Sequence, residues 1–177
     1  IKVAEKGQSL ADDIARVAAA RDALPSARLK VDANMGYTLA GALEALRKLC
    51  EYGIIYAEQP VASIEDMAAL RFAIAKEGLP ARIAADESIR KAEDPLKVAR
   101  ANAADLMVIK AAPLGGVRRA LALVEQAQLP AVVSSALESS VGIATGASLA
   151  ASLPTLRYGC GLGTVSLMAE DVTCLLY

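Results

Sequence analysis

The chain has 177 residues, of which 55% are hydrophobic and only 3% aromatic, so its core is expected to consist of aliphatic side chains. This length suits one domain with a substantial core. With 19 basic and 20 acidic residues the net charge is −1, which gives no support for nucleic-acid or anionic-membrane binding through bulk charge. The absence of histidine excludes Ser-His-Asp and Cys-His nucleophilic sites and argues against a zinc-hydrolase site.

The three cysteines, Cys50, Cys160 and Cys174, are too few and too scattered for a disulfide framework or a Cys-x-x-Cys metal site. The sequence also contains no signal peptide and no apolar run long enough to span a bilayer. We therefore expect a protein of the reducing cytoplasm.

Short apolar segments alternate with helical patterns along the whole chain. Local signals mark the helix ends: Ser9 with Asp12 forms a capping-box pattern, and Gly53 is placed to end the second helix. In chain order, strands are predicted at 1–5, 28–32, 54–58, 82–86, 105–110, 131–135 and 156–160. Helices are predicted between them, at about 9–24, 38–52, 63–77, 94–102, 117–128 and 139–153.

The predicted fold class is α/β, specifically an incomplete (β/α) barrel. The strands read as continuous apolar runs, which is typical of a parallel sheet covered on both faces. Seven such strands favour a barrel over a doubly wound sheet, although the chain is shorter than the ~250 residues typical of that fold. We expect residues 1–177 to be a barrel domain that lacks its first strand, which would precede Ile1.

Charged residues recur in phase at the predicted strand ends. Lys2, Asp32, Glu58, Asp86 and Lys110 follow one another at intervals of 30, 26, 28 and 24 residues. Ligands bind at the carboxyl ends of the strands in barrels and in open parallel sheets. The five side chains are therefore expected to meet in one site.

Three converging carboxylates would repel one another unless a cation lay between them. Oxygen ligands without histidine or cysteine suit a hard divalent ion, and Mg²⁺ is the expected one. Such an ion would bind a substrate carboxylate and stabilise the charge that develops when a neighbouring proton is removed. Of the two lysines that flank the carboxylates, one could take the proton while the other offers positive charge.

Simpler interpretations exist for each residue alone. A single charged residue at a strand end is most often a solvated turn residue, and residues 32–34 alone suit an Asx turn. Asn34 and Glu87 could support the metal ligands from behind or act as plain caps. Gly115 and Gly116 could cradle a phosphate or form a tight loop. The recurrence of all five charges in phase favours the site.

The strand-end motifs resemble those of the enolase superfamily, in the branch that has a lysine on each side of the site. The segment 132–142 is similar to the seventh-strand signature of the o-succinylbenzoate synthase family, and residues 85–90 and 159–162 resemble its actinobacterial members. The matching motifs are Lys2 in Ile-Lys-Val and the segments 31–34, 57–60, 85–88 and 108–110.

This resemblance implies roles for the individual residues. Asp32, Glu58 and Asp86 would bind Mg²⁺. Lys2 matches the second lysine of a Lys-x-Lys motif; it would remove the α-proton and then protonate the leaving hydroxide. Lys110 would lie opposite and stabilise the enolate by its charge.

The implied reaction is the syn dehydration of a succinyl-hydroxycyclohexadiene carboxylate to o-succinylbenzoate, a step of menaquinone synthesis. Backbone groups of Ser134, Ser135 and Gly161 would hold the succinyl tail. The family also has an N-terminal α+β capping domain, which we expect to be missing from residues 1–177.

Two other interpretations remain open at this point. One is an N-succinylamino acid racemase or epimerase that uses the same two lysines, and the other is an inactive barrel fragment or a purely structural domain. The expected partner of an enzyme here is a small-molecule carboxylate. The sequence leaves the oligomeric state open, although an exposed strand edge would favour association.

Overall fold

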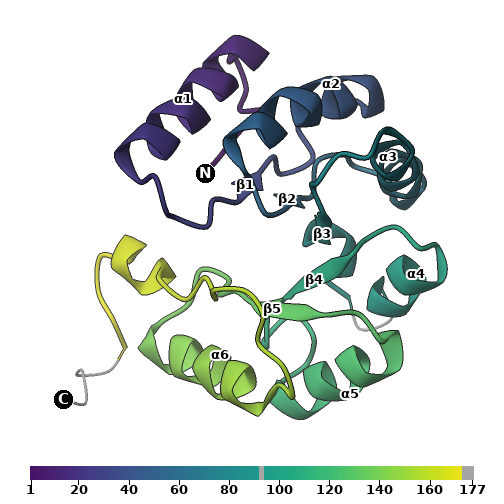
Figure 1. Cartoon of the computed structure of the whole chain (residues 1–177). Helices are drawn as coiled ribbons and strands as arrows, with labels where there is room; N and C mark the ends of the chain where they lie inside the picture. Colours follow the sequence, from purple (N-terminus) through teal and green to yellow (C-terminus); the bar gives the residue numbers. More distant parts are fainter. Residues whose placement is uncertain (92–93, 173–177) are drawn as a thin grey trace. The chain divides into compact units, whose positions relative to one another are not determined.

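The computed structural model describes residues 1–91 and 94–172. Strands and helices alternate along them, as Figure 1 shows. The strands are β1 (Val31–Asp32), β2 (Ala57–Glu58), β3 (Ile83–Ala85), β4 (Leu106–Ile109) and β5 (Ala131–Val133). The α-helices are α1 (Leu10–Ala23), α2 (Leu39–Leu49), α3 (Ile64–Glu77), α4 (Asp94–Arg100), α5 (Val117–Ala127) and α6 (Ser140–Ser152); the short 3₁₀ helices are η1 (Cys50–Tyr52), η2 (Glu87–Ile89) and η3 (Thr164–Leu167).

The chain divides into two compact units. The first contains Ile1–Ser88 and Arg100–Asp105, and the second contains Ile89–Ala99 and Leu106–Tyr177. Strands β1 to β3 belong to the first unit, and β4 and β5 belong to the second.

The first unit is a parallel sheet with helices packed beside it. Its strands follow the order β1-β2-β3, in the register Val31↔Ala57↔Ile83. Helix α2 packs between α1 and α3 (Figure 1). The apolar side of α2 is largely buried, with Leu46 and Leu49 at 2% and 0% exposure.

The capping signals of the first unit are confirmed. Ser9 and Asp12 form a reciprocal capping box at the start of α1. After α2 the chain continues through η1 to Gly53, which adopts a left-handed φ of 66° and ends the helical segment. Gly78 ends α3 in the same way, with φ 68°.

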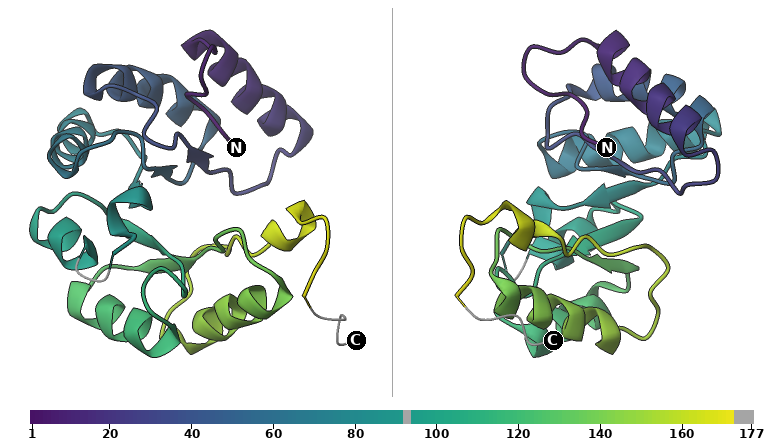
Figure 2. Two further views of the ribbon diagram at one scale, coloured as in Figure 1. Left: turned by 180° about the vertical axis from the view of Figure 1, so that it is seen from behind. Right: turned by 90° about the vertical axis from the view of Figure 1, so that its left-hand side faces the viewer.

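The second unit repeats the strand–helix pattern. Strands β4 and β5 pair in parallel, in the register Met107↔Ala131 and Ile109↔Val133. All residues of β4 are buried, as its continuous apolar run predicted. Helices α5 and α6 pack against each other, and α6 also contacts β5 (Figure 2).

The predicted first and last strands are much shorter than expected. Within 1–5 only Lys2 forms a bridge, in parallel with Asp32. Residues 156–160 form no strand; the pairing lies one residue further on, where Gly161 bridges Ser134. The apolar pattern therefore located these two pairings with the neighbouring strands to within one residue. It overestimated the lengths of the strands, because apolar residues do not show how many ladder hydrogen bonds form. Among the described residues, no helix is both long and apolar enough to cross a membrane.

A buried carboxylate fixes the segment that follows Lys2. Asp13, on α1, is only 1% exposed, and its Oδ2 accepts hydrogen bonds from the Ala4 backbone N–H at 3.0 Å and the Tyr37 hydroxyl at 2.7 Å. Burial, and then the hydrogen bond to Asp13, raise the pKa of Tyr37 well above its ordinary value of 10.0. One side chain thus ties α1 to the loops that follow Lys2 and β1.

The Tyr37–Asp13 bond should make stability depend on alkaline pH. Because the pKa of Tyr37 is raised by folding, the bond stabilises the fold fully below pH 10 and less as the pH rises above it. Near neutral pH we expect Tyr37→Phe to lower the free energy of unfolding by about 1.5–3 kcal/mol, the range for hydrogen bonds to charged groups. Urea unfolding of both proteins between pH 7 and about 11 should show this difference shrinking; a constant difference would contradict the assignment.

Candidate active site

A row of side chains crosses the first unit at the carboxyl ends of its strands. Lys2 pairs with Asp32, Asp32 with Glu58, and Glu58 with Ala84 on β3. Paired residues of parallel strands point to the same face, and so do residues two apart along one strand. The register therefore brings Lys2, Asp32 and Glu58 to one face, and Asp86 follows two residues after Ala84, just beyond the end of β3.

Lys2 is bonded to the first of these carboxylates. Its Nζ donates to Asp32 Oδ2 and, at 2.6 Å, to Asn34 Oδ1. The other oxygen of Asp32 accepts the Asn34 backbone N–H at 3.0 Å, which is the Asx turn that residues 32–34 suggested. The Asx turn, which was the simpler interpretation of these residues, is thus confirmed. Lys2 and Asp32 are also in direct contact, as a shared site would require.

Asn34 and Glu87, the predicted supporting residues, lie together. Asn34 Nδ2 donates to Glu87 Oε1 at 3.0 Å, while its Oδ1 accepts from Lys2. Asn34 has a left-handed φ of 43°, a conformation that asparagine tolerates better than most residues. The amide therefore connects the lysine to the loop that carries Asp86.

Sequence reasoning did not assign a role to Gln59, which the structure places at the centre of this region. Its side chain is 0% exposed, and its Oε1 accepts the backbone N–H groups of Asp86 and Ser88 at 3.1 and 3.2 Å. The sequence did contain a hint of this role: Gln59 lies between Glu58 and Pro60 at the end of a predicted buried strand, and a buried amide requires hydrogen-bond partners.

The donor set of the site suits magnesium, because Asp32, Glu58 and Asp86 offer only carboxylate oxygens. As the side chains stand, no three histidine, cysteine, aspartate or glutamate residues within 1–91 and 94–172 are gathered closely enough to hold a metal ion. Asp32 is instead engaged by Lys2 and by the Asn34 N–H. The chemistry of the ligands fits the ion, and the shared metal site remains a prediction.

The other predicted residues lie at the strand ends of the second unit. Lys110 directly follows β4, and Ser134 and Ser135 follow β5. The backbone N–H groups of Ser134, Ser135 and Gly161 donate to Ile109, Gly161 and Val133 at 2.8–2.9 Å. These three N–H groups are thus engaged in the sheet, and the hydroxyls of Ser134 and Ser135 also donate to the Gly161 carbonyl oxygen, at 3.3 and 3.1 Å.

Thr164 is a second residue that sequence reasoning missed. Its hydroxyl lies 2.9 Å from Ser135 Oγ and 2.5 Å from the Ala136 carbonyl oxygen, while Ser135 Oγ lies 3.1 Å from the Gly161 carbonyl oxygen. The contact joins two loops 29 residues apart in sequence, so no local sequence pattern could predict it.

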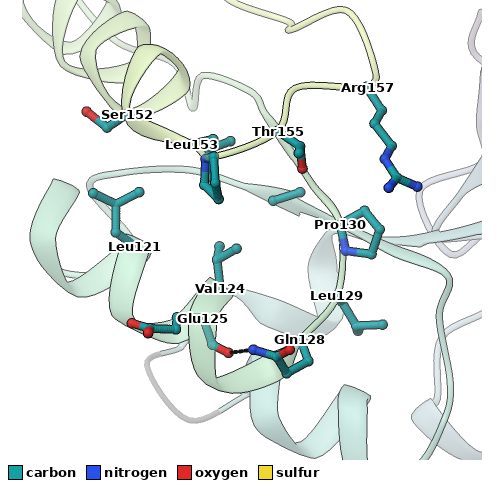
Figure 3. A pocket seen from close by; sticks show the side chains of 12 residues that line it. Leu121, Val124, Glu125, Gln128, Leu129, Pro130, Ser152, Leu153, Thr155 and Arg157 are labelled. Atoms are coloured by element: carbon teal, nitrogen blue, oxygen red, sulfur yellow. Dashed lines mark hydrogen bonds between the residues drawn. The ribbon is translucent and has the colours of Figure 1, made fainter.

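A cavity of about 490 Å³ lies in the second unit, away from these residues. Side chains from the ends of α5 and α6 line it, including Val124 and Leu153 (Figure 3). It also contacts Pro130 and Ala131, at the start of β5, whereas Ser134 and Ser135 follow the end of that strand. The cavity is therefore at the opposite end of β5 from the predicted site.

Comparison with known proteins agrees with this arrangement. Residues 1–173 match the family model described as "Enolase C-terminal domain-like". An o-succinylbenzoate synthase from Mycolicibacterium smegmatis is 57% identical over 97% of this chain and 52% of its own length. Solved structures are also similar: muconate cycloisomerase from Pseudomonas fluorescens (TM-score 0.84, 33% identity, 97% of this chain and 47% of that one) and a dipeptide epimerase from Enterococcus faecalis (TM-score 0.83, 27% identity, 97% and 49%).

The chain spans about half the length of the curated relatives that it matches. The family match nevertheless covers nearly all of its residues. The chain belongs to the Enolase C-terminal domain-like family, and its fold is part of the (β/α) barrel of the enolase superfamily.

Proposed function

We propose that residues 1–177 are the C-terminal barrel domain of a magnesium-dependent o-succinylbenzoate synthase, which dehydrates a succinyl-hydroxycyclohexadiene carboxylate in menaquinone synthesis. The observation that carries the proposal is the row from Lys2 through Asp32 to Glu58, with Asp86 directly after the end of the neighbouring strand β3. The choice of substrate is supported by the 57% identity to a synthase of that name.

Asp32, Glu58 and Asp86 would hold the magnesium ion. When bound, Mg²⁺ supplies positive charge beside a substrate carboxylate and so favours loss of the neighbouring proton. To bind the ion, Asp32 would have to release one carboxylate oxygen from Lys2. Its side chain is 18% exposed, so it has room to rotate that a fully buried side chain would lack.

Lys2 is proposed as the residue that moves the proton. Its two hydrogen bonds, to Asp32 and Asn34, fix the position of Nζ. A neutral amine has two N–H groups and one lone pair, so Lys2 could keep its bond to Asn34 while the lone pair faces the substrate. Lys2 would take the proton from carbon; the C–O bond of the hydroxyl then breaks, and the leaving hydroxide takes the same proton to form water.

Lys110 is proposed to stabilise the enolate by charge, without exchanging a proton. Ser134, Ser135 and Gly161 are proposed to line the place of the succinyl tail; their N–H groups and both serine hydroxyls already donate within the second unit, so contact with the tail would require some of these bonds to be exchanged.

A second candidate is an N-succinylamino acid racemase or epimerase. It is favoured by the structural similarity to a dipeptide epimerase and by the pair of lysines, each of which would then act on one face of the substrate.

The two candidates are separated by assaying each substrate with a protein that contains this chain at the length of its relatives. We expect aromatic product to form from the cyclohexadiene. Racemisation of an N-succinylamino acid without any dehydration would reject the synthase and support the second candidate.

Replacing Lys2 by alanine in that protein should lower kcat by about 10²–10⁴-fold, the usual contribution of a general acid–base residue. The fold should survive, because the Lys2 side chain is 55% exposed. Lys6→Ala is the matched control, since it removes a nearby exposed lysine outside the row. Near-normal turnover of Lys2→Ala, with circular dichroism unchanged, would contradict the role.

Asp86→Asn should weaken Mg²⁺ binding to the chain by more than about tenfold. Losing a residue that merely orients a metal ligand already costs about tenfold or more, and Asp86 is proposed as a ligand itself. The substitution keeps the size of the side chain and removes the charge that would attract the ion. Isothermal titration with MgCl₂ measures the affinity, and Asp22→Asn on α1 is the control. Equal affinities in the wild type and Asp86→Asn would count against the metal site.

A further inference from the structure

Gln59 joins the ends of three neighbouring strands. Its backbone N–H donates to Ala84 on β3 at 2.8 Å, and its carbonyl accepts from Met35, in the loop after β1, at 2.8 Å. The residue itself directly follows β2 and has a left-handed φ of 36°. This backbone conformation costs energy for any residue other than glycine, yet Gln59 adopts it where the three strand ends meet.

The hydrogen-bonding capacity of the Gln59 amide is fully used. Oε1 accepts the N–H groups of Asp86 and Ser88. Nε2 donates to Ser88 Oγ at 2.8 Å and to the Val61 carbonyl at 2.9 Å, and Met67 Sδ shares these hydrogens at 3.0 Å. An amide offers two lone pairs and two hydrogens, so all four are engaged. Rotating it by 180° would turn Nε2 toward two N–H donors, so these contacts fix its orientation.

We infer that Gln59 is a positioning residue, which holds the loop of the third proposed metal ligand in place. Strand β3 ends at Ala85, so the N–H groups of Asp86 and Ser88 lie beyond the ladder and find their acceptor in Gln59. The same loop carries Glu87, which accepts from Asn34. Gln59 follows Glu58 directly, and therefore links the backbone of one proposed ligand to that of the next.

This inference rests on the proposed magnesium site, and its test uses the metal alone. Gln59→Asn keeps the amide but shortens the side chain by one methylene, so that it no longer reaches Asp86 and Ser88. Gln59→Glu keeps the length and the acceptor oxygen; burial favours its neutral form, which can also donate. Met67→Leu removes only the sulfur acceptor: Met67 Sδ accepts from Gln59 Nε2 at 3.0 Å and from Ser88 Oγ at 3.7 Å, but it receives no backbone N–H of the loop.

Two measurements are made on the 177-residue chain and on each variant: Mg²⁺ affinity by titration calorimetry, and amide hydrogen exchange without metal. We expect Gln59→Asn to weaken Mg²⁺ binding by about 10–100-fold, the loss typical of residues that orient a ligand. Exchange should accelerate at Asp86 and Ser88 while β1 and β2 keep their protection. Gln59→Glu and Met67→Leu should retain both the affinity and the protection.

Unchanged Mg²⁺ affinity together with unchanged hydrogen exchange in Gln59→Asn would overturn the inference. Accelerated exchange over the whole first unit would also overturn it, because that result indicates a purely structural role. If Gln59→Asn does not fold, Gln59→Glu decides: loss of Asp86 protection in it would overturn the inference, and retention would support it. Failure of the metal site is distinct, because the wild-type chain would then not bind Mg²⁺ while the exchange results still test Gln59.

Discussion

The parallel register of the first unit is the constraint on which the proposed chemistry depends. It pairs Lys2 with Asp32 and Asp32 with Glu58, and therefore brings an amine and two carboxylates to one face at the same level of the sheet. A slip of one residue would turn every side chain of a strand to the opposite face. The short strands make this alignment sensitive, and contacts outside the ladder strengthen it: Asp13 holds Ala4 and Tyr37, and Gln59 holds the loop after β3.

Much of this arrangement was predictable because it depends on local patterns with a fixed period. Apolar runs located the strands, Ser9 and Gly53 marked helix ends, and the spacing of charged residues placed Asp32 and Glu58 at adjacent strand ends. Motif resemblance supplied the family, which the match over residues 1–173 confirms.

The rest depends on contacts that sequence separation hides. The hydrogen bond from Gln59 to the Asp86 N–H spans 27 residues, and that between Thr164 and Ser135 spans 29. Strand length was overestimated at 1–5 and 156–160 and also at 28–32 and 54–58, where β1 and β2 are two residues long, since apolar composition does not report how many ladder bonds form. The engagement of the Ser134 and Ser135 N–H groups in the sheet was equally invisible, because it is a property of pairing rather than of residue type.

The central proposal is that carboxylates from three adjacent strand ends bind a single hard cation. A crystal structure of the chain grown with Mn²⁺, a cation that also favours carboxylate oxygens, would locate the ion by its anomalous scattering. The account predicts one ion bound by oxygens of Asp32, Glu58 and Asp86. An ion bound by other residues, or no ordered ion at these three carboxylates, would contradict it.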